Sequence, residues 1–170
     1  MAANIIIFTA PVQAGKTTAL MRWAAKKDRL SGFLAPDADG LRRLFFLNTR
    51  QWADFQLTPA EASAADTGEV VAVGKFYFRA AAFAAARRVL AESLEQRHDW
   101  LVIDEVGKLE LKGEGLEPAV GQVIRYFKNP KTTGGLLLVV REELVAQAIA
   151  HYALENYRVI RLGEELPEGP

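Results

Sequence analysis

The 170-residue sequence contains no cysteine, which excludes a disulfide framework and a thiolate metal site. It contains only two histidines, His98 and His151, and we interpret each as a surface or helix-end residue rather than a metal ligand. No apolar run approaches the roughly 18 residues that a membrane span needs. The short N-terminal run NIIIF lacks the basic start of a signal peptide. These absences predict a soluble, cytoplasmic protein without a membrane partner.

The sequence also lacks an excess of charge of either sign. Lysine and arginine together number 21, and so do aspartate and glutamate, so the formal net charge is zero. A neutral chain produces no global field that attracts nucleic acid, and we find no clear nucleic-acid signal. Half of the residues are hydrophobic and a quarter are charged, which is typical of a globular protein. The length suits one domain with a sizeable core, and we expect residues 1–170 to form it.

Continuous apolar runs alternate with helix-forming segments along most of the chain. The first run, NIIIFT at 4–9, is rich in β-branched residues, as is typical of strands buried on both faces. Further runs that we expect to form core strands lie at 100–105, 136–140 and 157–162. The expected helices lie at 16–29, 79–97, 116–128 and 141–156. This alternation predicts an α/β fold, with a mainly parallel core sheet and helices on both faces.

The segment after the first expected helix has a different pattern. Short apolar runs at 33–35, 43–47 and 52–57 are separated by PDADG and NTR. Such turn residues typically join antiparallel strands. We interpret this segment as an inserted antiparallel β-meander, and Ser31 and Gly32 as the end of the helix before it, because glycine readily takes a positive φ. Another short strand is expected at 68–74.

The stretch APVQAGKTT at 10–18 follows the first expected strand and opens the first expected helix. Backbone N–H groups and a helix N-terminus in this position attract a phosphate. Gly15 allows close approach of the backbone, Lys16 reaches the β- and γ-phosphates, and Thr17 places its hydroxyl on Mg²⁺. The alternative is a chance GKTT at a helix start. The residues that we expect to bind the nucleotide are Ala10, Pro11, Val12, Gln13, Ala14, Gly15, Lys16, Thr17 and Thr18.

A second motif, WLVIDEVGKLEL, places two carboxylates at the end of an apolar strand. The carboxyl ends of parallel strands are where such sheets bind ligands. Asp104 is therefore a candidate ligand of Mg²⁺, through water. Glu105 is the candidate base that polarises the water attacking the γ-phosphate. The alternative is a strand followed by ordinary surface acids, but the two motifs occur in the correct order on the correct elements.

Several other residues have two open interpretations. Arg141 follows the expected strand at 136–140 and is either a catalytic arginine finger supplied in cis or an exposed residue at a helix start. Arg42 and Arg43 either contact substrate or are solvated charges. The aromatic residues of this region either stack on a base or belong to the core; they are Trp52, Phe55, Phe76, Tyr77 and Phe78.

These motifs resemble the THEP1-type nucleoside-triphosphatases, a P-loop NTPase family of the RecA-like, additional-strand division. The similar segments are GKTT, GFLAPDADGLRRLFF, VGKF followed by Phe83, IDEVGKLEL and VREELV, and they cover most of the chain. The resemblance implies a three-layer P-loop NTPase sandwich in which the strand at 136–140 lies between those at 4–9 and 100–105. It also implies Mg²⁺-dependent hydrolysis of ATP or other nucleoside triphosphates, with broad base tolerance.

The sequence departs from the family pattern at a few positions. Ala10 and Gln13 replace loop glycines, Asp37 stands near a family glutamate, and Leu44 replaces a glycine. Two other functions stay open on the same motifs. One is a kinase, with the meander and residues 106–118 holding the acceptor, and the other is a nucleotide-dependent switch that needs a protein partner. The sequence specifies neither that partner nor the base preference.

Overall fold

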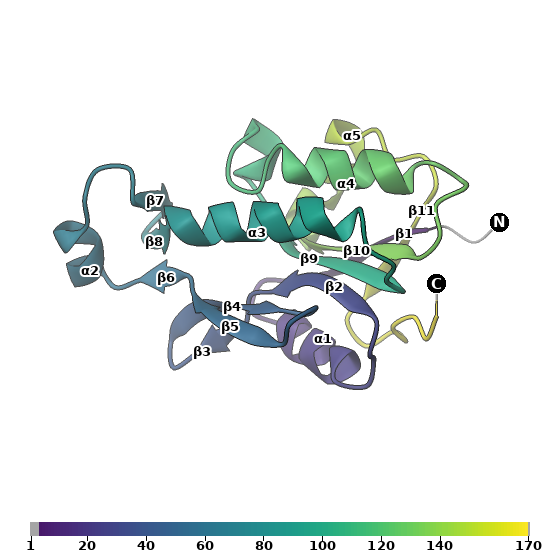
Figure 1. Ribbon diagram of the computed structural model, residues 1–170, viewed down its shortest axis with the longest axis horizontal. Helices are drawn as coiled ribbons and strands as arrows, with labels where there is room; N and C mark the ends of the chain where they lie inside the picture. Colours follow the sequence, from purple (N-terminus) through teal and green to yellow (C-terminus); the bar gives the residue numbers. More distant parts are fainter. Residues whose placement is uncertain (1–3, 170) are drawn as a thin grey trace.

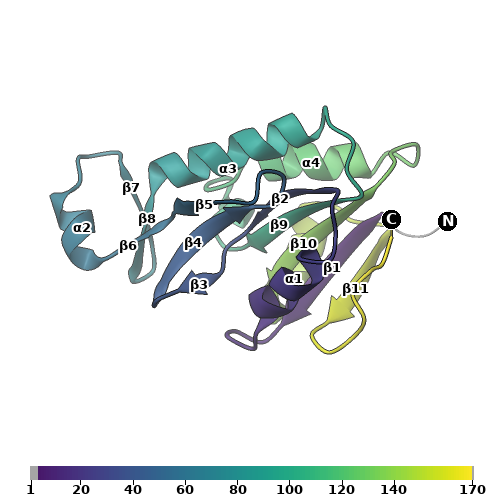
Figure 2. The same cartoon turned by 60° about the horizontal axis from the view of Figure 1, so that its bottom comes forward.

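The computed structural model describes residues 4–169 and contains one large mixed sheet. Its strand order is β11-β1-β10-β9-β2-β4-β3. The parallel strands are β1 (Ile5–Ala10), β2 (Leu30–Leu34), β9 (Trp100–Val106), β10 (Gly135–Arg141) and β11 (Tyr157–Arg161). Because β10 lies between β1 and β9, the strand order implied by the resemblance is confirmed. Figures 1 and 2 show this sheet from two directions.

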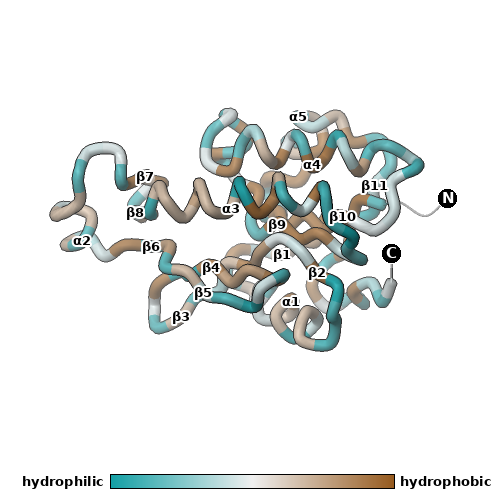
Figure 3. The backbone as a smooth tube through the Cα atoms, in the orientation of Figure 1, coloured by the Kyte–Doolittle hydropathy of each residue, from teal (hydrophilic) through white to brown (hydrophobic). Residues whose placement is uncertain are grey.

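Helices cover both faces of the sheet, which makes the three layers of an α/β sandwich (Figure 1). One face carries α1 (Lys16–Ala24), and the other carries α3 (Ala80–Ser93), α4 (Ala119–Phe127) and α5 (Val145–His151). Successive strand residues point to opposite faces, so Ile6 and Phe8 pack with Leu20 of α1. Ile5 and Ile7 pack in the core beneath α3 and α4. In Figure 3 hydrophobic residues, drawn in brown, gather along the central strands.

The inserted antiparallel segment consists of β3 (Asp37–Ala38), β4 (Leu41–Phe46) and β5 (Gln51–Asp54). Strand β4 pairs antiparallel with β2, β3 and β5, as the turn residues predict. Phe33 and Leu34 pair antiparallel with β4, as the meander predicts, but they belong to β2, which also pairs in parallel with β9. The interpretation of Ser31 and Gly32 as the end of a helix is wrong, because both lie inside β2. Helix α1 correspondingly ends at Ala24 rather than near residue 29.

Gly32 is the reason for that error. It lies inside β2 with a φ of +87°, and a Cβ atom built on it would lie 2.0 Å from the carbonyl oxygen of Val102 on β9. The absence of a side chain at Gly32 therefore permits the close approach of β2 and β9, and this glycine does not end a helix. The local sequence alone does not distinguish a glycine that ends a helix from one that allows two strands to approach closely.

A second, three-stranded sheet forms an arm that projects from the body of the molecule (Figure 1). The arm contains β6 (Gln56–Leu57), α2 (Pro59–Ala64), β7 (Val70–Val73) and β8 (Phe76–Arg79). Its base is held by Phe55, Phe78 and Phe83, whose ring centroids lie 4.6 Å (Phe55–Phe78) and 5.1 Å (Phe55–Phe83) apart. These rings belong to the core, whereas Trp52 and Phe76 are exposed.

Two other expectations need correction. The helix expected at 141–156 is a 3-10 turn, Glu142–Leu144, followed by the short α5, which ends before Ala153 with its left-handed φ of 47°. His98 is not a surface residue, because only 9% of it is exposed and it packs near Phe127. Within residues 4–169, no helix has the length and hydropathy that crossing a membrane requires.

Candidate active site

The loop between β1 and α1 has the backbone geometry that its glycine position requires. Gly15 is the N-cap of α1 with a φ of +97°, and a Cβ atom there would meet nothing within 4 Å. Glycine is thus needed here for the left-handed backbone conformation, and not because a side chain would clash in the ligand-free protein. Gln13 has a φ of 58°, which explains physically why loops of this kind carry glycine there. Ala10 is the last residue of β1 and keeps strand geometry, so this position does not require glycine.

Lys16 begins α1 and turns back over this loop. Its ammonium group donates to the carbonyl oxygens of Ala10 and Pro11, both at 3.4 Å, and the residue is only 8% exposed. The loop residues Pro11 to Gly15 are exposed, and Thr17 is half-buried. An ammonium group beneath an exposed loop of backbone N–H groups suits an anion better than any neutral ligand.

Asp104 connects the second motif to the first. The hydroxyl of Thr17 donates to its Oδ2 at 3.2 Å, and the backbone N–H of Ala35 donates to the same oxygen at 3.0 Å. Burial of this carboxyl, which is 4% exposed, raises its pKa from 3.8 to about 6, despite the hydrogen bond from Ala35. In the described part of the chain, Oδ1 accepts no hydrogen bond. Oδ1 and the Thr17 hydroxyl are hard oxygen donors of the type that Mg²⁺ takes beside substrate phosphates, so the residues fit this ion.

Glu105 is held by two arginines from different strands. Nε of Arg141 donates to Oε1 at 2.5 Å, and Nη1 of Arg42 donates to Oε2 at 3.4 Å. The register between β9 and β10 shifts here, because Val139 pairs with Asp104 and Val140 pairs with Val106. Glu105 is therefore left out of the strand pairing, and its side chain is only 14% exposed.

Arg141 lies beside the loop as well as beside Glu105. It is in register with Ala10 across the parallel pair β1 and β10. The structure thus places five predicted residues near the carboxyl ends of the neighbouring strands β9 and β10 or at the start of α1, the helix that follows β1. They are Lys16, Thr17, Asp104, Glu105 and Arg141.

Two contacts of this region were not expected. The interpretation of Arg42 as a solvated charge is incomplete, because it forms an ion pair with Glu105. The backbone N–H of Ala35, directly after β2, donates to Asp104, which no side-chain pattern can indicate. Glu110, farther along the second motif, stabilises the 107–116 turn, because its carboxylate accepts hydrogen bonds from the backbone N–H groups of Gly107 and Leu116.

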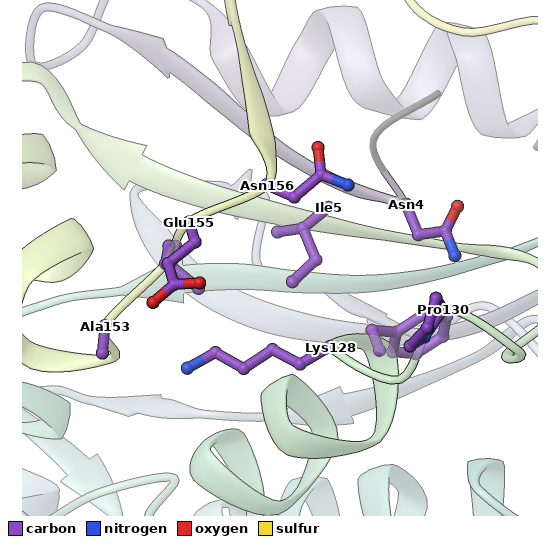
Figure 4. A pocket seen from close by; sticks show the side chains of 9 residues that line it. Asn4, Ile5, Lys128, Pro130, Ala153, Glu155 and Asn156 are labelled. Carbon is purple, nitrogen blue, oxygen red and sulfur yellow. The ribbon is translucent and has the colours of Figure 1, made fainter. Parts of the chain in front are cut away.

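A partly open cavity of about 330 Å³ lies away from this site (Figure 4). Asn4, Ile5, Lys128 and Glu155 are among the residues that line it, so it opens beside the amino end of β1. Ligands of parallel sheets bind at the carboxyl ends of the strands. The chemistry of the loop and the carboxylates therefore locates the site, and this cavity at the opposite end of β1 does not.

A family model described as NTPase matches residues 5–162. The chain belongs to this NTPase family. The fold also resembles the crystal structure of THEP1 from the hyperthermophile Aquifex aeolicus, with a TM-score of 0.68 and 19% sequence identity. That similarity covers 93% of this chain and 89% of THEP1. Family and fold together confirm the resemblance to THEP1-type NTPases, and a search among curated proteins gave no match.

The buried carboxyl of this NTPase predicts a gain in stability when its charge is removed. The folded protein binds more protons at Asp104 than the unfolded chain between pH 3.8 and about 6, so the free energy of unfolding falls as pH rises through this window. The difference corresponds to about 3 kcal/mol above pH 6. Asp104→Asn should be more stable than wild type there, by up to about 3 kcal/mol, in the metal-free protein.

Urea unfolding across this pH window checks the prediction. Both hydrogen bonds to Asp104 reach one oxygen, so an amide oxygen can accept both. The matched control is Asp99→Asn, which removes a half-exposed carboxylate paired with Arg29 at 3.4 Å and should change stability by less than about 0.5 kcal/mol. A less stable Asp104→Asn protein at neutral pH would contradict the burial argument.

Proposed function

We propose that the protein is an Mg²⁺-dependent nucleoside-triphosphatase that hydrolyses nucleoside triphosphates to diphosphates and phosphate, with broad base tolerance. The observation that carries this proposal is the contact between Thr17 and Asp104 at 3.2 Å beneath the loop, with Glu105 adjoining. It joins a phosphate-binding element to the carboxylates on which metal binding and water activation depend. NTPase family membership supports the same reaction class.

Substrate binding uses groups that the ligand-free protein already holds in place. The N–H groups of the loop and the N-terminus of α1 face the phosphates. The ammonium of Lys16 exchanges its two carbonyl contacts for β- and γ-phosphate oxygens, a stronger charge-assisted interaction. Thr17 and Asp104 would hold Mg²⁺, which would neutralise negative charge on the phosphates.

Hydrolysis then needs a base and a stabilising cation. Glu105 accepts a proton from water while the water oxygen bonds to the γ-phosphorus and the bond from that phosphorus to the leaving oxygen breaks. The nucleoside diphosphate leaves with the electron pair of that bond. Arg141 donates to Glu105 through Nε and is in register with Ala10 at the loop, which supports its proposed role as the cation that stabilises the developing negative charge.

Phosphate release from a panel of nucleoside triphosphates tests this function. Purine and pyrimidine substrates should differ by less than about 1.4 kcal/mol, or one decade in kcat/KM, because no base-reading motif is recognisable. A chelator should abolish turnover and added Mg²⁺ should restore it. A preference of about a thousandfold for one base would contradict broad tolerance and indicate a dedicated kinase.

Arg141→Ala should lower kcat far more than it weakens nucleotide binding. The loss is expected to be on the order of 10²–10³ in kcat, because the arginine acts where charge develops. Steady-state kinetics and the Kd of a fluorescent nucleotide separate the two effects. Arg158→Ala, which removes an exposed arginine from β11, is the control and should behave as wild type. An unchanged kcat in a folded Arg141→Ala protein would return this residue to a surface role.

A further inference from the structure

The inserted meander contributes one side chain to the candidate site. Arg42 lies in β4, and its guanidinium group contacts Oε2 of Glu105 at 3.4 Å. The meander is otherwise distant from the loop in sequence, and β4 joins the parallel core only through β2. A strand that is not part of the parallel core therefore completes the surroundings of the proposed base.

The two arginines around Glu105 differ in how they are placed. Arg141 is the last residue of β10, next to the loop, where a nucleotide would compete for its contacts. Arg42 lies inside β4, where its residue is paired with Asp37 and its backbone N–H donates to Oε1 of Gln56 at 3.1 Å. Backbone pairing on one side and a side-chain acceptor on the other fix the position of Arg42.

Glu105 depends on such a contact because the strand itself does not orient it. Glu105 has no pairing partner on β10, because the register between β9 and β10 shifts at this residue. Among residues 4–169, the partners of its carboxylate are these two arginines. A nucleotide that draws Arg141 toward its γ-phosphate would leave Arg42 as the cation that holds the carboxylate.

We propose that Arg42 is a positioning residue for Glu105: from the inserted β4 it holds Oε2, so that Oε1, which accepts from Arg141 in the ligand-free protein, is aimed at the attacking water during phosphate cleavage. This inference rests on the proposed role of Glu105 as general base. The inserted meander thereby takes part in turnover. Displacement of β4 should lower kcat without weakening nucleotide binding.

The neighbouring residue offers a matched control. Arg43 is on the same strand with nearly the same exposure, 40% of its side chain against 37% for Arg42. Adjacent strand residues point to opposite faces. Arg43 accordingly pairs with Asp54 at 3.3 Å and lies 5.5 Å from the centre of the Trp52 ring. Replacing it removes the same charge from the same strand without touching Glu105.

The experiment compares steady-state kinetics and fluorescent-nucleotide binding of Arg42→Gln, Arg42→Lys and Arg43→Gln. We expect Arg42→Gln to lower kcat by about 10- to 100-fold, as loss of a group that orients a functional side chain commonly does. Its KM and Kd should stay within about threefold of wild type. Arg42→Lys, which keeps the charge, should recover part of kcat and carries the test if the glutamine variant folds poorly. Arg43→Gln should match wild type.

A double mutant separates this inference from the proposed function. If Arg42 acts through Glu105, Arg42→Gln combined with Glu105→Gln should be no slower than Glu105→Gln alone. An unchanged or raised kcat in Arg42→Gln would overturn the inference, and so would a higher KM with unchanged kcat, which would indicate direct substrate binding. Wild-type hydrolysis by Glu105→Gln would instead overturn the proposed function itself.

Discussion

Lys16→Ala should lose nearly all nucleotide binding and turnover while it keeps the fold. The ammonium lies against the loop, at the carbonyl oxygens of Ala10 and Pro11, and its loss is expected to lower kcat/KM by at least on the order of 10²–10³. The residue is buried, but its ammonium contacts two carbonyl oxygens and, in the described part of the chain, no carboxylate. Its removal therefore leaves no unpaired acid behind, and nucleotide titration with phosphate-release kinetics measures the effect.

Two controls distinguish loss of charge from loss of packing in this experiment. Lys16→Met keeps the volume of the buried stem and should be as inactive as Lys16→Ala but closer to wild type in stability. Lys26→Ala removes an exposed lysine just beyond the end of α1 and should leave kcat/KM unchanged. A Lys16→Ala protein that binds and hydrolyses ATP like wild type would show that the loop is not a phosphate site.

Glu105→Gln should separate binding from chemistry. Glutamine keeps the size and reach of glutamate and can still accept from Nε of Arg141, but it cannot take a proton from water at neutral pH. Hydrolysis is expected to fall by on the order of 10²–10⁴, the usual contribution of a general base. Nucleotide and Mg²⁺ should still bind, because Lys16, Thr17 and Asp104 are untouched.

Isolation of the complex gives the most direct readout of this variant. The Mg²⁺ complex with ATP should survive gel filtration and release intact ATP on denaturation, whereas wild type should return ADP. Glu114→Gln, a change of the same chemistry on an exposed turn residue, is the control and should turn over normally. Loss of nucleotide binding in Glu105→Gln would make Glu105 a structural or metal-binding residue instead.

The sequence predicts the parts of the site that lie within short contiguous motifs. Gly15, Lys16 and Thr17 follow a buried strand and start a helix, so their backbone context comes with the motif itself. Asp104 and Glu105 end another buried strand, and parallel strands place their carboxyl ends at the same edge. The contact between Thr17 and Asp104 follows from these two facts once β10 lies between the strands.

Contacts that depend on the register of the insertion could not be predicted in this way. Arg42 and Arg43 are chemically identical neighbours, and only the pairing of β4 decides which of them faces Glu105. Gly32 gave a misleading helix-end signal because its role depends on Val102, seventy positions away in the sequence. Helix ends are poorly specified for a similar reason, since tertiary packing rather than propensity decides where a helix stops.

The central claim is that water is the phosphate acceptor and that Glu105 activates it. Hydrolysis of ATP by the wild-type protein in water labelled with heavy oxygen, with Mg²⁺ and no other acceptor, tests both parts when Glu105→Gln is run beside it. We expect the label in the released phosphate and not in ADP, with the rate lost in the variant. Phosphate that forms only after an acceptor is added, label in ADP, or equal rates in the two proteins would contradict the claim.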